Sequence, residues 1–255
     1  MGAIRLGLQY LLSFIFIVQM YVALLVVAII YLPAMLISRQ GARNGAHAYC
    51  RWVVLTARWL VGLKVDIRGE VPQDSVLIAA KHQSFFDIIL IFGSLPNPRF
   101  IMKRELIYTP ILGQYALRMG CIPVDRSKGG AAIRKLLTDV KRYMKDGGQL
   151  IIYAQGTRLA PGASAPYKIG TGALYQTLKI DCVPVATNVG IFWPRRGMLR
   201  TPGTAVVEFL PRIPPGLPVS DFMAKIESVI EPASDALMIE TGFDLEAAKA
   251  AHRAV

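Results

Sequence analysis

The feature of this sequence that most restricts its fold is a long apolar run near the N-terminus. From Leu6 to Ser38 the chain carries no charged residue. Because about 20 apolar residues suffice to cross a bilayer as a helix, the run predicts a helical membrane anchor. It is too long for the core of a signal peptide, and no small-residue cleavage site closes it cleanly. Pro33 lies near its end, where we expect it to kink or stop the helix.

Positive charge is distributed unevenly around this run. Arg5 precedes it, and a larger group of arginines follows it. The arginines that follow are Arg39, Arg43, Arg51 and Arg58. If the run spans the membrane, this asymmetry places the rest of the chain on the cytoplasmic side.

The next stretch, residues 46–63, carries Arg51 and Arg58 among apolar residues that include Trp52 and Trp59. Basic residues and tryptophans on an apolar helix are typical of the headgroup zone of a membrane. An ordinary buried helix with two solvated arginines has the same pattern. A helical pair that dips into one leaflet is the alternative to a full crossing. We therefore interpret residues 1–63 as an N-terminal membrane-anchoring helical segment.

The overall composition fits one globular domain attached to a membrane. With 53% hydrophobic and 18% charged residues, the chain is too apolar for a purely soluble domain and too charged for a polytopic membrane protein. Its formal net charge of +12 predicts an anionic partner, either nucleic acid, an anionic membrane face or a phosphorylated substrate. The apolar N-terminus favours the last two, and no nucleic-acid-binding module is recognisable.

The three cysteines are far apart in the sequence and odd in number. They are Cys50, Cys121 and Cys182. No pair has the spacing of metal ligands or of a secreted disulfide framework. We interpret them as reduced structural residues facing a cytosolic environment, and none is a candidate nucleophile.

Residues 64–255 alternate between short apolar runs and helical stretches. The expected strands are residues 76–80, 99–102, 121–124, 150–154, 183–187 and 205–210. The clearest helix covers about residues 131–145, where apolar residues recur at three- and four-residue steps before Gly147 and Gly148. This alternation predicts an α/β domain with a mostly parallel central sheet flanked by helices. The proline-rich piece 211–218 separates the last strand from a C-terminal helical tail.

His82 and Asp87 are the candidate catalytic pair. Both follow the strand that ends at Ala80. Residues five apart on one helix point about 140° away from each other, so the two side chains meet only if His82 lies in the loop and Asp87 in the first helical turn. Ser84 is a suitable N-cap for that arrangement. The carboxylate would then fix the imidazole tautomer, while the other ring nitrogen takes a proton from an alcohol.

Each residue of the pair also has a purely structural interpretation. Asp87 stands three residues after Ser84, which is the spacing of a capping box. His82 alone would fit a hydrogen-bonded loop residue. No serine or cysteine has the spacing of a nucleophile elbow, so the sequence indicates direct attack by a substrate hydroxyl.

Two further segments that follow strands have the chemistry of an anion site. Arg126 comes just beyond the strand of residues 121–124. Gly156, Thr157 and Arg158 offer a flexible turn, a hydroxyl and a guanidinium, a combination that suits phosphate. Because the carboxyl ends of parallel strands meet at one crevice, we expect these groups to lie near His82. Lys103 is a weaker candidate by the same reasoning, and each cation taken alone also fits an ordinary surface charge.

Together these segments resemble the glycerolipid acyltransferase family, especially the bacterial 1-acylglycerol-3-phosphate acyltransferases. The sequence His82-x4-Asp87 resembles the family's catalytic motif, and residues 120–126, 155–158 and 183–185 resemble its second, third and fourth motifs. The resemblance covers about residues 45–215. It implies an α/β fold with an N-terminal helical anchor. It also implies a general base at His82 with Asp87 as its partner, and a phosphate site at Arg126, Gly156, Thr157 and Arg158.

The chain departs from the family pattern at two positions. Gln155 stands where the third motif usually has Glu, and Lys81 stands where Asn is common. Gln keeps an acceptor oxygen but loses the negative charge, so it would hold a neighbouring arginine less firmly. Gln155 is therefore a candidate supporting residue of the site, together with Lys103.

The resemblance implies an enzyme that moves a fatty acyl group from an acyl thioester to the free hydroxyl of 1-acylglycerol-3-phosphate, giving phosphatidic acid. The implied donor is acyl-CoA or acyl carrier protein as a co-substrate, with no bound cofactor and no metal. The expected partners are anionic inner-leaflet lipids and lysophosphatidic acid, with the domain on the cytoplasmic face of the inner membrane. Another acceptor such as a lyso-ornithine lipid, or a non-catalytic membrane-binding homologue, is the alternative.

Overall fold

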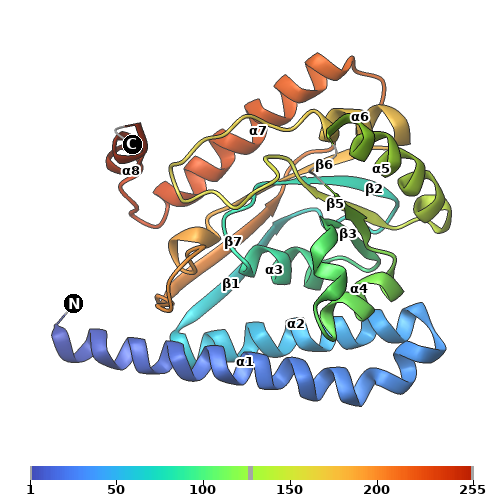
Figure 1. Cartoon of the computed structure of the whole chain (residues 1–255). Coiled ribbons are helices and arrows are strands. Elements are labelled where there is room, and N and C mark those ends of the chain that lie inside the picture. Colours follow the sequence, from blue (N-terminus) through green and yellow to red (C-terminus); the bar gives the residue numbers. More distant parts are fainter. Residues whose placement is uncertain (1, 126–128, 254–255) are drawn as a thin grey trace.

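The computed structural model describes residues 2–125 and 129–253. A single seven-stranded sheet lies between two layers of helices (Figure 1). The strands are β1 (Leu63–Gly69), β2 (Val76–Ala80), β3 (Pro98–Lys103), β4 (Ile122–Val124), β5 (Gln149–Tyr153), β6 (Cys182–Thr187) and β7 (Gly203–Phe209). The helices are α1 (Ala3–Ile37), α2 (Arg39–Val61), α3 (Phe86–Ser94), α4 (Leu112–Met119), α5 (Gly129–Tyr143), α6 (Gly170–Leu178), α7 (Val219–Ile239) and α8 (Leu245–Arg253).

The sheet confirms the predicted α/β fold. Its strand order is β1-β7-β6-β2-β5-β3-β4, and every neighbouring pair is parallel except β6 with β7. All six expected strands are present with shifts of one or two residues at their ends. Strand β1, an edge strand that pairs in parallel with β7, was not among the expected strands.

The central strand β2 shows why the sheet needs helices on both faces. All five of its residues are buried, as expected for a parallel strand covered on both sides. Ile78 and Ala80 belong to the core shared with α2 and α3, whereas Leu77 and Ala79 belong to the core shared with α5, α6 and α7. Alternate side chains of a strand point to opposite faces, so one short run contributes to both cores.

Helices α1 and α2 form an antiparallel pair, which we call the anchor hairpin (Figure 1). Helix α1 continues through Pro33 and ends at Ile37, so of the two expected effects of Pro33, a kink or a stop, the stop does not occur. The connection is tight, because the side-chain oxygen of Ser38 accepts a hydrogen bond from the Gly41 amide at 2.9 Å. A side chain at Gly41 would collide with the Ala34 carbonyl, so glycine allows this close approach.

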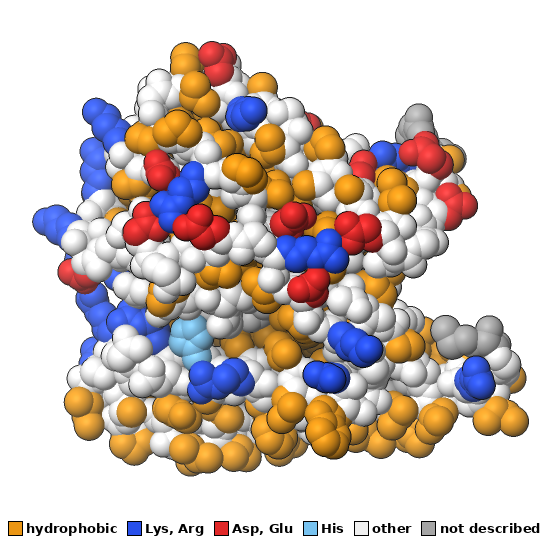
Figure 2. Space-filling view, turned by 180° about the vertical axis from the view of Figure 1, so that it is seen from behind, with side chains coloured by type: hydrophobic (Ala, Val, Ile, Leu, Met, Phe, Trp, Pro, Cys, Tyr) orange, Lys and Arg blue, Asp and Glu red, His pale blue; other side chains and the backbone are white. Residues whose placement is uncertain are grey.

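One face of the anchor hairpin exposes large apolar side chains. In Figure 2 they gather along the lower margin of the molecule, with lysine and arginine side chains immediately above. Helix α1 contributes Leu25, Ile29 and others, and α2 contributes Trp59, which is 79% exposed. Among the described residues, α1 is the one helix long and apolar enough to cross a membrane.

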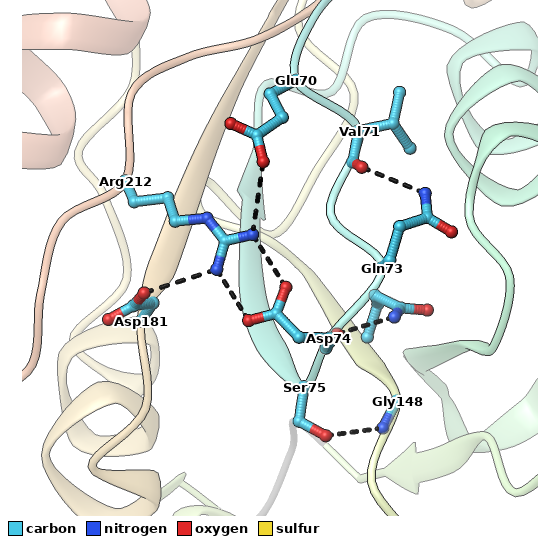
Figure 3. Close-up of polar contacts among 9 residues, drawn as sticks. Glu70, Val71, Gln73, Asp74, Ser75, Gly148, Asp181 and Arg212 are labelled. Atoms are coloured by element: carbon cyan, nitrogen blue, oxygen red, sulfur yellow. Dashed lines mark hydrogen bonds and ion pairs between the residues drawn. The ribbon is translucent and has the colours of Figure 1, made fainter.

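Arg212 links three loops at the edge of the sheet where β2 and β6 begin (Figure 3). Its guanidinium makes two contacts of 2.7 Å to the Asp74 carboxylate, and it lies 3.5 Å from Asp181 and 3.9 Å from Glu70. These carboxylates raise the pKa of Arg212 above its ordinary value, and Arg212 lowers the pKa of Asp74. We call this edge the amino edge and the opposite one, where β2 ends, the carboxyl edge.

Candidate active site

The candidate residues lie in loops at the carboxyl edge. Strands β6, β2, β5, β3 and β4 are neighbours, and all five run in the same direction. The loops after β2 and β5 therefore start side by side, and they carry His82 and the 156–158 turn. Lys103 closes β3, but its side chain is 63% exposed and pairs with Glu105 at 3.3 Å. Arg126 falls outside the described residues.

His82 and Asp87 meet in the predicted way. His82 lies in the loop after β2, and Asp87 lies in the first turn of α3. The Nδ1 atom of His82 is 2.9 Å from Oδ1 of Asp87. A carboxylate accepts but does not donate, so this contact places the ring proton on Nδ1 and leaves Nε2 able to accept a proton.

Asp87 is held by backbone amides as well as by the imidazole. Its Oδ2 accepts hydrogen bonds of 2.8 Å from the amides of Gln83 and Ser84, and the side chain is completely buried. The N-cap of α3 is Phe85, one residue after the expected Ser84, and the Ser84 hydroxyl accepts a hydrogen bond from the Phe86 amide at 3.1 Å. The backbone hydrogen bonds fix the carboxylate in position, and the carboxylate in turn fixes the ring.

Tyr153 packs against one face of the His82 imidazole. This contact was not expected from the sequence. The Tyr153 ring stacks on that of His82 with centroids 3.7 Å apart and planes 15° from parallel. Burial, followed by the nearby Asp87 carboxylate, raises the pKa of Tyr153 well above its ordinary value, so the phenol stays neutral. As the last residue of a buried strand, Tyr153 gives no sequence signal that separates it from the core.

The 156–158 turn lies against the loop that carries His82. Gly156 has a φ of +72°, which favours glycine, and its amide donates to the Tyr153 carbonyl at 2.9 Å. The Leu159 amide donates to the His82 carbonyl at 2.8 Å, so the two loops are joined directly. Thr157 is exposed and Arg158 is half-buried. The structure therefore brings this predicted turn to His82.

Comparisons with known proteins agree with this geometry. The family model described as Acyltransferase matches residues 63–188, which include the whole catalytic loop and the 156–158 turn. The chain belongs to this acyltransferase family. Two curated relatives are 1-acyl-sn-glycerol-3-phosphate acyltransferases. The one from Pseudomonas aeruginosa is 29% identical over 66% of each chain, and the one from Cocos nucifera is 27% identical over 78% of this chain and 67% of its own.

A solved structure shows the same fold. The crystal structure of the 1-acyl-sn-glycerophosphate (LPA) acyltransferase PlsC from Thermotoga maritima superposes with a TM-score of 0.75 at 19% identity. The match covers 93% of this chain and 99% of that one, so it includes the anchor hairpin as well as the sheet.

In this acyltransferase the anchor hairpin contacts the active-site loops through Trp193. Its ring stacks on Phe86 at 5.0 Å and meets Phe16 of α1 edge to face at 5.4 Å. The Arg200 guanidinium covers the Trp193 ring at 4.5 Å, and the Arg200 amide donates to the Ser13 hydroxyl of α1 at 3.0 Å. Helix α1 is thus connected to the first turn of α3 through the Trp193 ring.

The same loop supplies a cation that the sequence analysis missed. Arg195 is exposed, and its Nη1 donates to the Arg158 carbonyl at 3.1 Å. It follows β6, which neighbours β2 in parallel, so it reaches the carboxyl edge by the same rule as Arg158. The sequence feature that could have indicated this cation is the adjacent pair Arg195-Arg196, which comes shortly after a predicted strand.

A charged cluster lies next to the loop that carries His82. Glu231 of α7 accepts contacts from Lys81 Nζ at 2.5 Å, from Gln155 Nε2 at 3.2 Å and from the Tyr167 hydroxyl at 2.8 Å. We call these four residues the Glu231 cluster. A cavity of about 220 Å³ adjoins Lys81 and Glu231. The larger cavity, about 450 Å³, lies between α2 and the C-terminal end of α3, away from His82.

Within residues 2–125 and 129–253 there is neither an exposed cysteine thiol nor a group of side chains that could hold a metal ion. All three cysteines are buried free thiols, and burial raises the pKa of Cys121 to about 11 and also raises that of Cys182. In the same part of the chain, no group of three or more His, Cys, Asp and Glu residues could hold a metal ion.

Proposed function

We propose that this acyltransferase moves a fatty acyl group from an acyl thioester to the free hydroxyl of 1-acylglycerol-3-phosphate, giving phosphatidic acid. The observation that carries the proposal is the contact between His82 Nδ1 and Asp87, which leaves Nε2 as the proton acceptor beside a turn that bears Arg158. The relatives named above carry the same acceptor in their names.

In the proposed mechanism, His82 is the general base. Its Nε2 takes the proton of the acceptor hydroxyl while the oxygen attacks the thioester carbonyl carbon. The carbon–sulfur bond then breaks, and the thiol leaves with the proton that the imidazolium returns. Asp87 stabilises the imidazolium between these steps. General-base assistance of this kind contributes about 10²–10⁴-fold to the rate, and positioning of the two substrates supplies much of the remainder.

The acceptor phosphate is assigned to the cations around the 156–158 turn. Arg158 offers a bidentate fork and Thr157 a hydroxyl, and Gly156 supplies the positive-φ backbone of the turn. Arg126 belongs to the same proposed site by resemblance. Arg195 joins them because it contacts the Arg158 backbone. The donor in this proposal is acyl-CoA or acyl-loaded carrier protein, acting as a co-substrate without a bound cofactor.

For the membrane arrangement we propose that the anchor hairpin lies in one leaflet and does not cross the bilayer. Helix α1 is hydrogen-bonded to the domain, since Gln9 donates to the carbonyls of Val61 and Arg200 at 3.2 and 2.7 Å. A helix held along the domain in this way keeps its exposed apolar face directed outward, as Figure 2 displays. Residues 1–63 then form the anchor and residues 64–255 the catalytic domain, on the cytoplasmic face of the inner membrane.

The test is a matrix of donors and acceptors with the purified full-length protein. Labelled acyl-CoA and acyl carrier protein are each paired with 1-acylglycerol-3-phosphate, with a lyso-ornithine lipid and with a lysolipid that lacks phosphate. We expect transfer to the phosphate-bearing acceptor with one donor or both. Transfer confined to the ornithine lipid would replace the acceptor assignment, and no transfer with any pair would leave the chain a membrane-binding homologue.

A further inference from the structure

The Glu231 cluster contains one negative charge shared among three donors. Lys81 Nζ, Gln155 Nε2 and the Tyr167 hydroxyl all contact the Glu231 carboxylate. Lys81 is only 3% exposed and Glu231 is 27% exposed, so the lysine charge depends on this carboxylate. A buried charge without a partner is strongly destabilising, whereas a paired one is tolerated.

The orientation of Gln155 also depends on Glu231. Its amide nitrogen faces the carboxylate, and its Oε1 is buried without a hydrogen-bond partner among the described residues. A reversed amide would point its oxygen at the carboxylate, so this orientation is the one that the charge selects. Burial and the neighbouring Glu231 carboxylate both raise the pKa of Tyr167, which therefore remains a neutral donor.

Each of the two loops that carry the proposed chemistry has a residue of this cluster within its first two positions. Lys81 precedes His82 in the chain, and its amide donates to the Val185 carbonyl at 2.9 Å. Gln155 precedes the 156–158 turn and follows Tyr153, whose ring stacks on His82. Glu231 of α7, 76 residues further along the chain than Gln155, thus contacts both loops through one side chain.

We propose that Glu231 is a positioning residue for the catalytic loop, and that it supplies from α7 the carboxylate which the third family motif usually carries at the position of Gln155. Positions 155 and 231 then hold one negative charge between them, on either side of a single amide–carboxylate hydrogen bond. The positioning role rests on the proposed acyl transfer, whereas the shared charge does not depend on it.

If positions 155 and 231 share one negative charge, placing the usual family residue Glu at position 155 should lower stability and activity. In Gln155→Glu two carboxylates face each other at the place of a 3.2 Å hydrogen bond. In Glu231→Gln the buried Lys81 loses its counter-charge. The double variant Gln155→Glu/Glu231→Gln exchanges the two groups and keeps one carboxylate, one amide and the Tyr167 hydroxyl, which can accept as well as donate.

The experiment compares these three variants with the wild-type full chain by thermal unfolding and by steady-state acyl transfer, well below the unfolding midpoint. We expect each single variant to unfold at a lower temperature and to lose about tenfold or more in kcat, as for a lost charge-assisted hydrogen bond. The double variant should regain most of both. Ile226→Val, a buried change on the same helix, is the control that lowers stability without touching the cluster, and its kcat should stay at the wild-type value.

Each outcome decides a part of the inference. Wild-type stability in Gln155→Glu, or no recovery in the double variant, would overturn the shared charge. Recovery of the unfolding temperature without recovery of kcat would overturn the positioning role, as would an equal loss of kcat in Ile226→Val. If a single variant does not accumulate as folded protein and the double variant does, the shared charge is supported. If the wild type transfers no acyl group, the proposed function fails, while the unfolding measurements still decide the shared charge.

Discussion

The two edges of the sheet hold their charged groups in different ways. At the amino edge Arg212 is surrounded by three carboxylates, and its side chain is 32% exposed while that of Asp74 is 55% exposed. At the carboxyl edge Asp87 is completely buried and Lys81 is 3% exposed. The amino-edge contacts join loops, whereas the carboxyl-edge contacts orient an imidazole and the turn beside it.

Because the charged groups at the two edges differ in burial, substitutions there should differ in the size of their effects. Exposed ion pairs are screened by water and contribute roughly 0–1 kcal/mol. Buried groups have few substitute partners, so loss of one of them leaves its neighbour unpaired. We therefore expect large effects on activity at the carboxyl edge and small effects on stability at the amino edge.

The largest effect is expected for His82→Ala. Removal of the proton acceptor should lower kcat by about 10³-fold, within the usual range for a general base. Initial-rate measurements with 1-acylglycerol-3-phosphate check this, and vesicle flotation of the same protein should show unchanged membrane binding. Near-wild-type turnover in this variant would remove His82 from the mechanism.

Asp87→Asn should come next, with kcat reduced by about 10²–10³-fold because the amide no longer fixes the tautomer of His82 or stabilises its protonated form. The change should also reduce stability, since the backbone amides of Gln83 and Ser84 both donate to this side chain. Single-turnover transfer and urea unfolding separate the two effects. A variant that loses stability and keeps its rate would show Asp87 to be only a helix cap.

Arg158→Gln should raise the KM for the phosphate-bearing acceptor about tenfold, because one bidentate charge pair is lost, and should leave the donor KM unchanged. The matched control is Arg196→Gln, which removes an exposed charge from the neighbouring loop, directly before Gly197. Equal changes in both variants would indicate a general electrostatic effect rather than a phosphate contact.

The smallest effect is expected for Arg212→Gln. We expect wild-type kcat and a loss of stability below about 1 kcal/mol at neutral pH. Arg212 holds the pKa of Asp74 below its ordinary value, so the stabilisation is complete above about pH 4 and is lost as the pH falls through the folded-state pKa. Thermal unfolding of both proteins from pH 7 to pH 3 should show their difference shrink on acidification. A substantial loss of activity at pH 7 would contradict the division between the edges.

Much of the carboxyl edge was predictable from local sequence. The buried run of β2 and the spacing from His82 to Asp87 predicted both the strand and the contact, because a loop followed by a helical turn brings residues five apart together. The turn at 156–158 was placed by the parallel order of the strands. Pro33 was less informative, since the helix ends at Ile37, where Ser38 and Gly41 form the connection.

What the sequence alone determined is the set of local elements: an apolar N-terminal helix, short buried strands, and reactive side chains at their carboxyl ends. Tertiary structure decided which distant residues complete them. Tyr153 under His82, Arg195 beside Arg158, and Glu231 between Lys81 and Gln155 come from other strands, loops and helices. The physical reason is that periodicity reports how a segment is buried, whereas a hydrogen bond between remote segments depends on how the layers pack.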